Sequence, residues 1–224
     1  RAALAAAGLA AQGWLVSIGI EAQSPETGFG YLQRGEPIGA DGFRTARFVE
    51  KPELELVRQF IASGDYAWNG GIFAFGVGTF LRELEAHAPA ILAAARAAVA
   101  SGHSEGHLFF PGADEFAQAP SISVDYAVME PTAHKAMVPA DMGWSDIGSW
   151  DALHAAVERD ADGNSPRGAV ELVDCRNVLV DSDGPRVSVI GLSDVVIVID
   201  GNDVLVTTHD GAQKVGKLHG AVHQ

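Results

Sequence analysis

Cysteine and positive charge are both scarce in this sequence of 224 residues. It contains one cysteine, Cys175, so no disulfide can form within the chain. We expect a buried structural thiol at this position and a reducing compartment, the cytoplasm, for the protein. Lysine and arginine number 15 against 29 aspartates and glutamates, which gives a formal net charge of −14. Because such a charge repels phosphate backbones, we expect no nucleic acid among the partners.

Long apolar runs are also missing, so we expect no membrane-spanning helix and no membrane partner. Hydrophobic residues nevertheless make up 47% of the chain, which is enough for a sizeable core and excludes disorder as the dominant state. The Ala-rich start, residues 1–10, predicts an ordinary helix rather than a signal peptide. The chain begins with Arg1 rather than methionine, and we expect it to start inside a longer protein.

The first 150 or so residues alternate between strand-like and helix-like stretches. Short apolar runs predict strands at 14–20, 43–50 and 71–75. Apolar residues at helical spacing, with proline and glycine at the ends, predict helices at 52–64, 80–87, 91–100 and 150–157. Alternation of this kind predicts a layered α/β fold whose sheet is mostly parallel in its centre.

A cluster of turn-forming residues at 160–166 predicts a linker, which divides the chain into domains 1–160 and 161–224. Short β-rich runs follow at 177–180, 187–190, 195–199 and 204–208, with a tight turn predicted at 200–203. This spacing suits either a small β-solenoid or a small sandwich. Because the second domain is too small to be stable alone, we expect it to pack on its neighbour or on a second copy.

Two candidate ligand segments lie in the first third of the chain. Thr27 and Gly28 belong to a Gly-rich turn whose backbone could approach a ligand closely, although a plain turn before a strand explains this segment better when it is taken alone. At a predicted strand end, Glu50 could accept paired hydroxyl groups and Lys51 could hold a phosphate. A surface ion pair before a helix is an equal alternative for these two residues.

Two further segments complete the set of candidates. Asn69 and Gly70 precede a predicted strand, where the Asn69 amide could both donate to and accept from hydroxyl groups. Asp146, in a glycine-flanked turn, could hold Mg²⁺ through one carboxylate oxygen, although a helix N-cap is the commoner use of such a residue. His103 and His107 have the spacing of zinc ligands on a helix, but Gly102 and Gly106, one before each histidine, argue against a helix there.

The order of these segments resembles that of the bacterial mannose-1-phosphate guanylyltransferases, the GDP-mannose pyrophosphorylase group of sugar nucleotidyltransferases. Phe-Val-Glu-Lys-Pro at 48–52 is shared with many sugar nucleotidyltransferases. Asp-Tyr-Ala-Val-Met-Glu at 125–130 and Trp-Ser-Asp-Ile-Gly-Ser-Trp at 144–150 point more narrowly to mannose. The resemblance covers about 15–153, and the β-rich tail is similar to the group's left-handed β-helix segment.

The resemblance implies a Mg²⁺-dependent transfer of GMP from GTP to mannose 1-phosphate, with release of pyrophosphate. It implies a Rossmann-like, glycosyltransferase-A-like mixed sheet that is incomplete at its N-terminus, followed by a β-helix-like tail. Because that tail is too small to stand alone, a homodimer could form through it. The implied roles are sugar hydroxyl binding for Glu50, phosphate binding for Lys51, a pocket lining for Asn69, Gly70, Thr27 and Gly28, support of that pocket for Asp125, and Mg²⁺ ligation for Asp146.

The sequence departs from the group at one important point. The Gly-rich, arginine-bearing loop that cradles the nucleotide phosphates and a second metal-binding aspartate are not found in it. We therefore expect no nucleotidyl transfer by this stretch alone, which an assay with radiolabelled GTP would test. Two alternatives stay open: another sugar 1-phosphate, such as glucose 1-phosphate, as substrate, and a non-catalytic sugar-phosphate-binding or assembly module.

Overall fold

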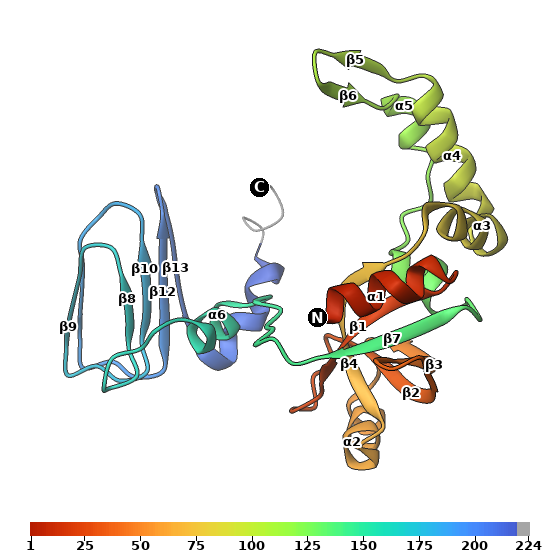
Figure 1. Cartoon of the computed structure of the whole chain (residues 1–224). Coiled ribbons are helices and arrows are strands. Elements are labelled where there is room, and N and C mark those ends of the chain that lie inside the picture. The colour runs from red at the N-terminus through yellow and green to blue at the C-terminus, as the bar shows by residue number, and fades with distance from the viewer. Residues whose placement is uncertain (219–224) are drawn as a thin grey trace. The chain divides into compact units, whose positions relative to one another are not determined.

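The computed structural model describes residues 1–218 and divides into two compact units, Arg1–Trp144 and a second unit that begins at Ser145. Figure 1 labels most of the elements of both units. The second unit starts before residue 160 because α6 (Trp150–Ala156) packs on the β-rich part through Trp150, which contacts the cluster of Leu179, Val196 and Val198. Within residues 1–218, no helix has the length and apolar character needed to cross a membrane.

The first unit is built on five strands that close into a barrel in the order β1–β4–β2–β3–β7. The strands are β1 (Leu15–Glu21), β2 (Gly30–Ile38), β3 (Gly42–Glu50), β4 (Tyr66–Ala74) and β7 (Lys135–Ala140). In this sheet β1 and β7 run parallel, and the other neighbouring pairs are antiparallel. The mixed sheet is confirmed, but the expected mostly parallel centre is wrong, because apolar runs reveal strands without revealing their direction.

The strand expected at 71–75 begins earlier, at Tyr66, so that Asn69 and Gly70 lie inside β4 rather than in a loop before it. Gly70 is buried, and a Cβ added there would stand 3.1 Å from the carbonyl oxygen of Ile18 in β1. Two adjacent glycines in this sequence therefore mark a close approach of strands and a bulge rather than a loop. The left-handed φ of Gly71, 66°, marks that bulge.

The helices of the first unit are α1 (Ala2–Ala11), α2 (Leu54–Ser63), α3 (Val77–His87), α4 (Pro89–Ala100), the short α5 (Ala113–Phe116) and the π-helix η1 (Asp125–Met129). Those expected at the Ala-rich start and at 52–64, 80–87 and 91–100 are present, although α3 begins three residues earlier than expected, and α5 and η1 were not predicted. In α2 the buried Val57 and Phe60 face the core, and Gly64 ends the helix in the left-handed conformation. A short hairpin, β5 (His103–Glu105) and β6 (Leu108–Phe110), follows α4 (Figure 1).

Two hydrophobic clusters hold the sheet of the first unit. One joins α1 to the sheet through Leu9, Val16 and Val138, and it also includes Trp68. The other joins α3, α4 and η1 to the sheet through Leu84, Leu92 and Val128. Helix α1 and η1 thus pack against different clusters of the first unit.

The second unit is a small solenoid, which decides between the two folds left open by the sequence. Its strands are β8 (Ser165–Arg167), β9 (Val170–Val173), β10 (Leu179–Ser182), β11 (Val187–Ile190), β12 (Val195–Asp200) and β13 (Asp203–Thr208). Strands β8, β10 and β12 pair in parallel, as do β9 and β11, which is the pairing of successive solenoid coils. The predicted turn at 200–203 is confirmed as the loop of the β12–β13 hairpin.

The solenoid interior is formed by Val178, Val180, Val189 and Ile197, and Cys175 is buried among them as expected. Corners of the coils carry aspartate or asparagine in the left-handed conformation, at Asp174, Asn177 and Asp194. The unit is completed by α6 and by the 3₁₀ helix η2 (His209–Lys217). The last residues of the predicted tail domain, 219–224, lie outside the described part of the chain.

Candidate functional site

Three of the predicted site residues come together in the first unit. Glu50 ends β3, Asn69 lies within β4, and Asp125 begins η1. Gly30, the first residue of β2, pairs with Glu50 in register. A Cβ at Gly30 would collide with the Glu50 carboxylate and stand 3.2 Å from the Cβ of Asn69. Glu50 and Asn69 therefore meet over a position where the missing side chain leaves room for them.

A hydrogen bond fixes the orientation of the Asn69 amide. Its Nδ2 donates to Oδ1 of Asp125 over 3.0 Å, and its Oδ1 accepts from the backbone N–H of Gly71 over 3.3 Å. An amide nitrogen carries two hydrogens, so one Nδ2–H is left to donate to a ligand. Asp125 thus sets which end of the Asn69 amide can serve as a donor.

Electrostatics distinguish Glu50 from an ordinary surface glutamate. Burial raises the pKa of Glu50, the negative charges of Asp125 and Glu130 raise it further, and Lys51 opposes them. The Glu50 side chain is 11% exposed and its Oε1 lies 3.8 Å from Nζ of Lys51, whose side chain is 61% exposed. A largely buried acceptor beside an exposed cation suits a ligand that carries both hydroxyl groups and a phosphate.

The backbone of Lys51 joins the site to the turn before β2. Lys51 has a φ of 48°, a left-handed conformation that a lysine seldom adopts, and its N–H donates to the carbonyl oxygen of Phe29 over 3.2 Å. Thr27 and Gly28 form the exposed tip of the same turn. Gly70, by contrast, is buried against β1, where its contribution is to bring two backbones close together.

Aromatic side chains that sequence reasoning did not assign to the site support this turn. The ring of Phe29 packs edge-to-face on Trp68 and on Trp144, with centroids 5.2 Å and 5.6 Å away. The Nε1–H of Trp68 donates to the hydroxyl of Tyr31 over 3.0 Å. The glycines on both sides of Phe29 were the available sequence signal for a role in the site. Aromatic residues are, however, more often core residues, and the hydrogen bond between Trp68 and Tyr31 depends on tertiary contacts.

Glu130 is a further residue that the structure adds to the site. Its charge contributes to the raised pKa of Glu50, and it closes the motif at 125–130. Lys135 in β7 lies next to it and donates from Nζ to the carbonyl oxygens of Glu130 and Thr132 over 2.6 Å and 2.8 Å. Burial lowers the pKa of Lys135, and the charge of Glu130 opposes that shift. These bonds tie the end of η1 to the sheet.

Asp146 belongs to the second unit, in the exposed loop before α6. The N-cap of α6 is Ser149, whose Oγ accepts from the N–H of Ala152 over 3.2 Å, so the cap does not use Asp146. Gly148 leaves open the space beside the Asp146 carboxylate, since a Cβ there would stand 2.6 Å from Oδ2. An exposed carboxylate with room beside it fits one ligand of a cation that is also bound by phosphates.

A dedicated metal cage is missing from the described residues, because no group of three or more histidine, cysteine, aspartate or glutamate side chains there could hold a metal ion. His103 lies in β5 and His107 in the turn after it, so the helix needed for paired zinc ligands does not form. His103 instead faces Glu105, with 3.3 Å between Nε2 and Oε1.

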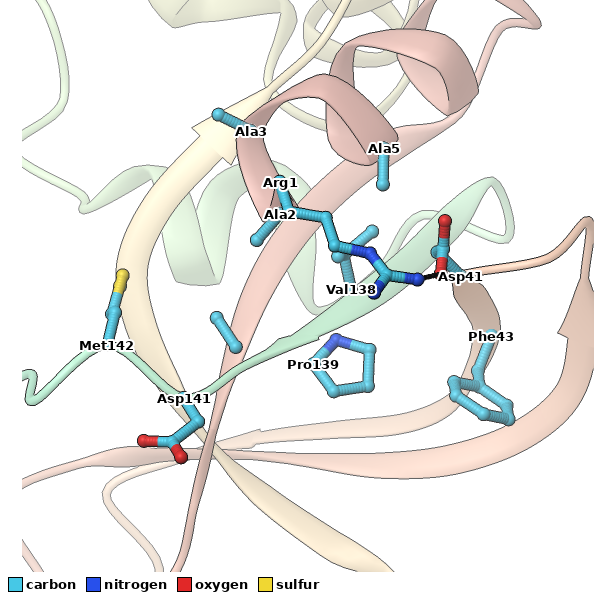
Figure 2. Close-up of a pocket in the computed structure, with 11 residues that line it drawn as sticks. Arg1, Ala2, Ala3, Ala5, Asp41, Phe43, Val138, Pro139, Asp141 and Met142 are labelled. Atoms are coloured by element: carbon cyan, nitrogen blue, oxygen red, sulfur yellow. Dashed lines mark hydrogen bonds and ion pairs between the residues drawn. The ribbon is translucent and has the colours of Figure 1, made fainter.

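A cavity of about 590 Å³ lies beside the start of α1 and the end of β7. Figure 2 shows Arg1 and Asp41 joined across it by an ion pair, with 3.0 Å between Nη2 and Oδ1. Its other lining residues include Phe43, Val138 and Pro139. Phe43 and Glu50 lie at opposite ends of β3, so this cavity is separate from the site around Glu50.

Comparisons with known proteins agree with this geometry. The chain is 41% identical over 209 residues to the mannose-1-phosphate guanylyltransferase of Sinorhizobium fredii, a match that covers 93% of this chain and 41% of that protein. It is 39% identical over 210 residues to the mannose-1-phosphate guanylyltransferase of Escherichia coli K12, covering 92% of this chain and 44% of that protein. The chain thus spans less than half the length of these curated relatives.

A solved structure supports the same relationship. The crystal structure of mannose-1-phosphate geranyltransferase from Thermus thermophilus superposes with a TM-score of 0.84 at 30% identity, covering 100% of this chain and 64% of that chain. The MannoseP isomerase/GMP-like beta-helix domain matches residues 168–219. The nucleotidyl transferase family matches residues 1–163, and by this match the chain belongs to that family.

Proposed function

We propose that this chain is part of an enzyme that transfers GMP from GTP to α-D-mannose 1-phosphate, giving GDP-mannose and pyrophosphate. The observation that carries the proposal is the meeting of Glu50 and Asn69 over Gly30, with Asp125 bonded to Asn69. Relatives at about 40% identity carry the name of this activity, and the group's motifs fall on the residues that meet. The chemistry of these side chains suits a phosphorylated sugar.

Each site residue of the first unit has a proposed task in binding the sugar phosphate. Glu50, held as an acceptor beside Lys51, binds sugar hydroxyl groups, and Asn69 donates its remaining Nδ2–H to a neighbouring hydroxyl. Lys51 supplies the charge for the sugar phosphate, which its exposed side chain can reach. The Thr27–Gly28 turn closes the pocket through its backbone, and Asp125 holds Asn69 in its binding orientation.

The reaction is a displacement at phosphorus. A phosphate oxygen of mannose 1-phosphate attacks the α-phosphorus of GTP, a new P–O bond forms, and the bond from the α-phosphorus to the bridging oxygen of pyrophosphate breaks. Catalysis of this kind rests on positioning and charge stabilisation, so the task of this chain is to hold the sugar phosphate and orient its oxygen. Asp146 is the proposed ligand of Mg²⁺, which offsets phosphate charge when bound.

A turnover assay on the full-length protein tests the proposal. We expect radiolabelled GTP to yield labelled GDP-mannose when mannose 1-phosphate and Mg²⁺ are present, and much less product with glucose 1-phosphate at the same concentration. Preference for glucose 1-phosphate would instead support the alternative substrate. Binding of mannose 1-phosphate without turnover would support the non-catalytic module. Homodimerisation through the C-terminal segment and a cytoplasmic location stay predictions.

A further inference from the structure

Tyr31 is a buried polar residue beside the site that the proposed mechanism has not used. It is the second residue of β2, is 0% exposed, and pairs in register with Val49 and Trp68. Its hydroxyl donates to the backbone carbonyl oxygen of Glu26 over 3.0 Å and accepts from Nε1–H of Trp68 over 3.0 Å. Burial raises the pKa of Tyr31, which keeps the hydroxyl protonated and able to donate.

These bonds fix one end of the turn that carries Thr27 and Gly28. The Tyr31 hydroxyl donates to the carbonyl oxygen of Glu26, the residue directly before the tip. Phe29 is held one residue after the tip, by the N–H of Lys51 and by its packing on Trp68. Within the described part of the chain, the tip itself forms no side-chain hydrogen bond, so its position is set by these two anchors.

We infer that Tyr31 is a positioning residue, whose hydroxyl holds the Thr27–Gly28 turn where it can contact the sugar phosphate. This inference rests on the proposed function, because the turn matters for activity only if a sugar phosphate binds beside Glu50 and Lys51. Trp68 also contributes to holding the turn, since it orients the Tyr31 hydroxyl and is followed directly in β4 by Asn69. One hydroxyl thus links the turn to the strand that carries the Asn69 amide.

A merely structural role for Tyr31 would reside in its ring, which packs on Phe60 with centroids 5.6 Å apart. Tyr31→Phe keeps that ring and removes only the hydroxyl. Tyr66→Phe is a matched control, because Tyr66 stacks on the same Phe60 ring at 3.8 Å and its hydroxyl makes no hydrogen bond within residues 1–218. Comparing the two variants separates the loss of a hydrogen-bonded hydroxyl at Tyr31 from the loss of a tyrosine hydroxyl elsewhere on the Phe60 ring.

The experiment measures kinetics and amide hydrogen exchange on the full-length protein. For Tyr31→Phe we expect the KM for mannose 1-phosphate to rise about 5- to 20-fold, with kcat within about threefold, because a binding element is loosened rather than a catalytic one. Amides of residues 24–29 should exchange at least several-fold faster than in the wild type, while those of β1 and β7 keep their rates. Tyr66→Phe should change none of these quantities.

The outcomes separate this inference from the function on which it rests. If the wild type neither binds nor uses mannose 1-phosphate, the proposed function fails, and faster exchange at 24–29 in Tyr31→Phe still supports the anchor. If the wild type is active and Tyr31→Phe matches it in KM and exchange, the inference is overturned. Trp68→Phe is the second variant should Tyr31→Phe not fold; it removes the donor to Tyr31 and also alters the packing on Phe29, and we expect the same pattern.

Discussion

Two amide side chains, Asn164 in the second unit and Asn69 in the first, differ in whether their hydrogen bonding is complete. In the second unit, Nδ2 of Asn164 donates to Asp160 and to the carbonyl oxygen of Cys175, and its Oδ1 accepts from the N–H of Val178. In the first unit, Glu50 is buried among like charges, and Asn69 keeps an N–H to spare. Complete bonding indicates a structural role, whereas unused capacity in an unfavourable environment indicates a binding role.

Backbone conformation separates the solenoid from the loops that carry candidate site residues. The left-handed residues of the solenoid, Asp174, Asn177 and Asp194, are of the types that tolerate this conformation, whereas Ile147, next to Asp146 in the loop before α6, is not. In the first unit the non-glycine residue in this conformation is Lys51, for which it is strained. Strain at a lysine persists because the surrounding structure imposes it, and here it is placed at the proposed phosphate site.

The largest effect on stability is expected for Asn164→Ala. This change leaves the N–H of Val178 and the carbonyl oxygen of Cys175 without partners inside the solenoid, which costs about 2–4 kcal/mol. Chemical denaturation measures this loss of stability, and hydrogen exchange of the amides of residues 165–200 shows whether the loss lies in the solenoid. Asn69→Ala is the matched change in the first unit, and we expect it to affect sugar binding far more than stability. Equal destabilisation by both variants would break the comparison between the units.

The next effect in size is expected at Lys51. Lys51→Ala should lower kcat/KM for mannose 1-phosphate about 10- to 100-fold, because it removes a charge that contacts phosphate. Lys51→Gly should lose as much activity but unfold at a higher temperature than Lys51→Ala, since glycine relieves the left-handed strain. Steady-state kinetics and calorimetry on the full-length protein measure both. Wild-type kinetics in either variant would remove Lys51 from the phosphate site.

A smaller effect is expected at Asp146. Asp146→Asn should lower kcat about tenfold and raise the Mg²⁺ concentration needed for half-maximal rate, because a neutral amide is a weaker ligand than a carboxylate. The measurement is a Mg²⁺ titration of initial rates. Asp203→Asn, which neutralises an exposed carboxylate of the same unit, serves as the control and should match the wild type. An unchanged Mg²⁺ requirement in Asp146→Asn would rule out the proposed ligand.

The smallest effect concerns pH. His154 is 2% exposed, and its Nε2–H donates to the carbonyl oxygen of Gly163 over 2.8 Å. Burial lowers the pKa of His154, and the charges of His209 and Arg159 act in the same direction, while the bond to Gly163 and the charge of Asp151 oppose them. The unfolded chain binds a proton near its ordinary pKa of about 6.5, and the folded chain does so only at lower pH.

The sign of the pH effect follows from that difference. The stability contributed by neutral His154 is fully present above a pH of about 6.5 and is lost as the pH falls through the lower pKa of the folded protein. We expect the melting temperature to fall less between pH 7.5 and 5 in His154→Gln than in the wild type. Identical pH profiles would show that His154 does not contribute to acid sensitivity.

Much of the fold could be predicted from local patterns. Alternating or continuous apolar runs identified β1, β3, β11 and β12, and proline and glycine marked the ends of α2. Strand direction was not predictable, because pairing of β1 with β7 joins residues more than 100 positions apart. Strand β8, Ser-Pro-Arg, carries little apolar signal, and β9 is only four residues long although Val170, Leu172 and Val173 in it are apolar.

The site could be predicted as a set of residue types but not as an arrangement. Glu50 and Asn69 stood out because a carboxylate and an amide suit hydroxyl groups, and the motif that begins at Asp125 was part of the resemblance. The bond between Asn69 and Asp125 spans 56 positions, and the charges that raise the pKa of Glu50 belong to Asp125 and Glu130, which are still further from it in sequence. Only folding brings these groups together, so spacing could not reveal their contacts.

The most direct test of the account is a calorimetric titration of mannose 1-phosphate into the full-length protein, comparing the wild type with Glu50→Gln. Because the pKa of Glu50 is raised, its charge destabilises the fold at neutral pH, and glutamine should leave the melting temperature unchanged or raise it. The account predicts at least about tenfold weaker binding by this equally stable variant. Equal affinities for the sugar phosphate in the two proteins would contradict it.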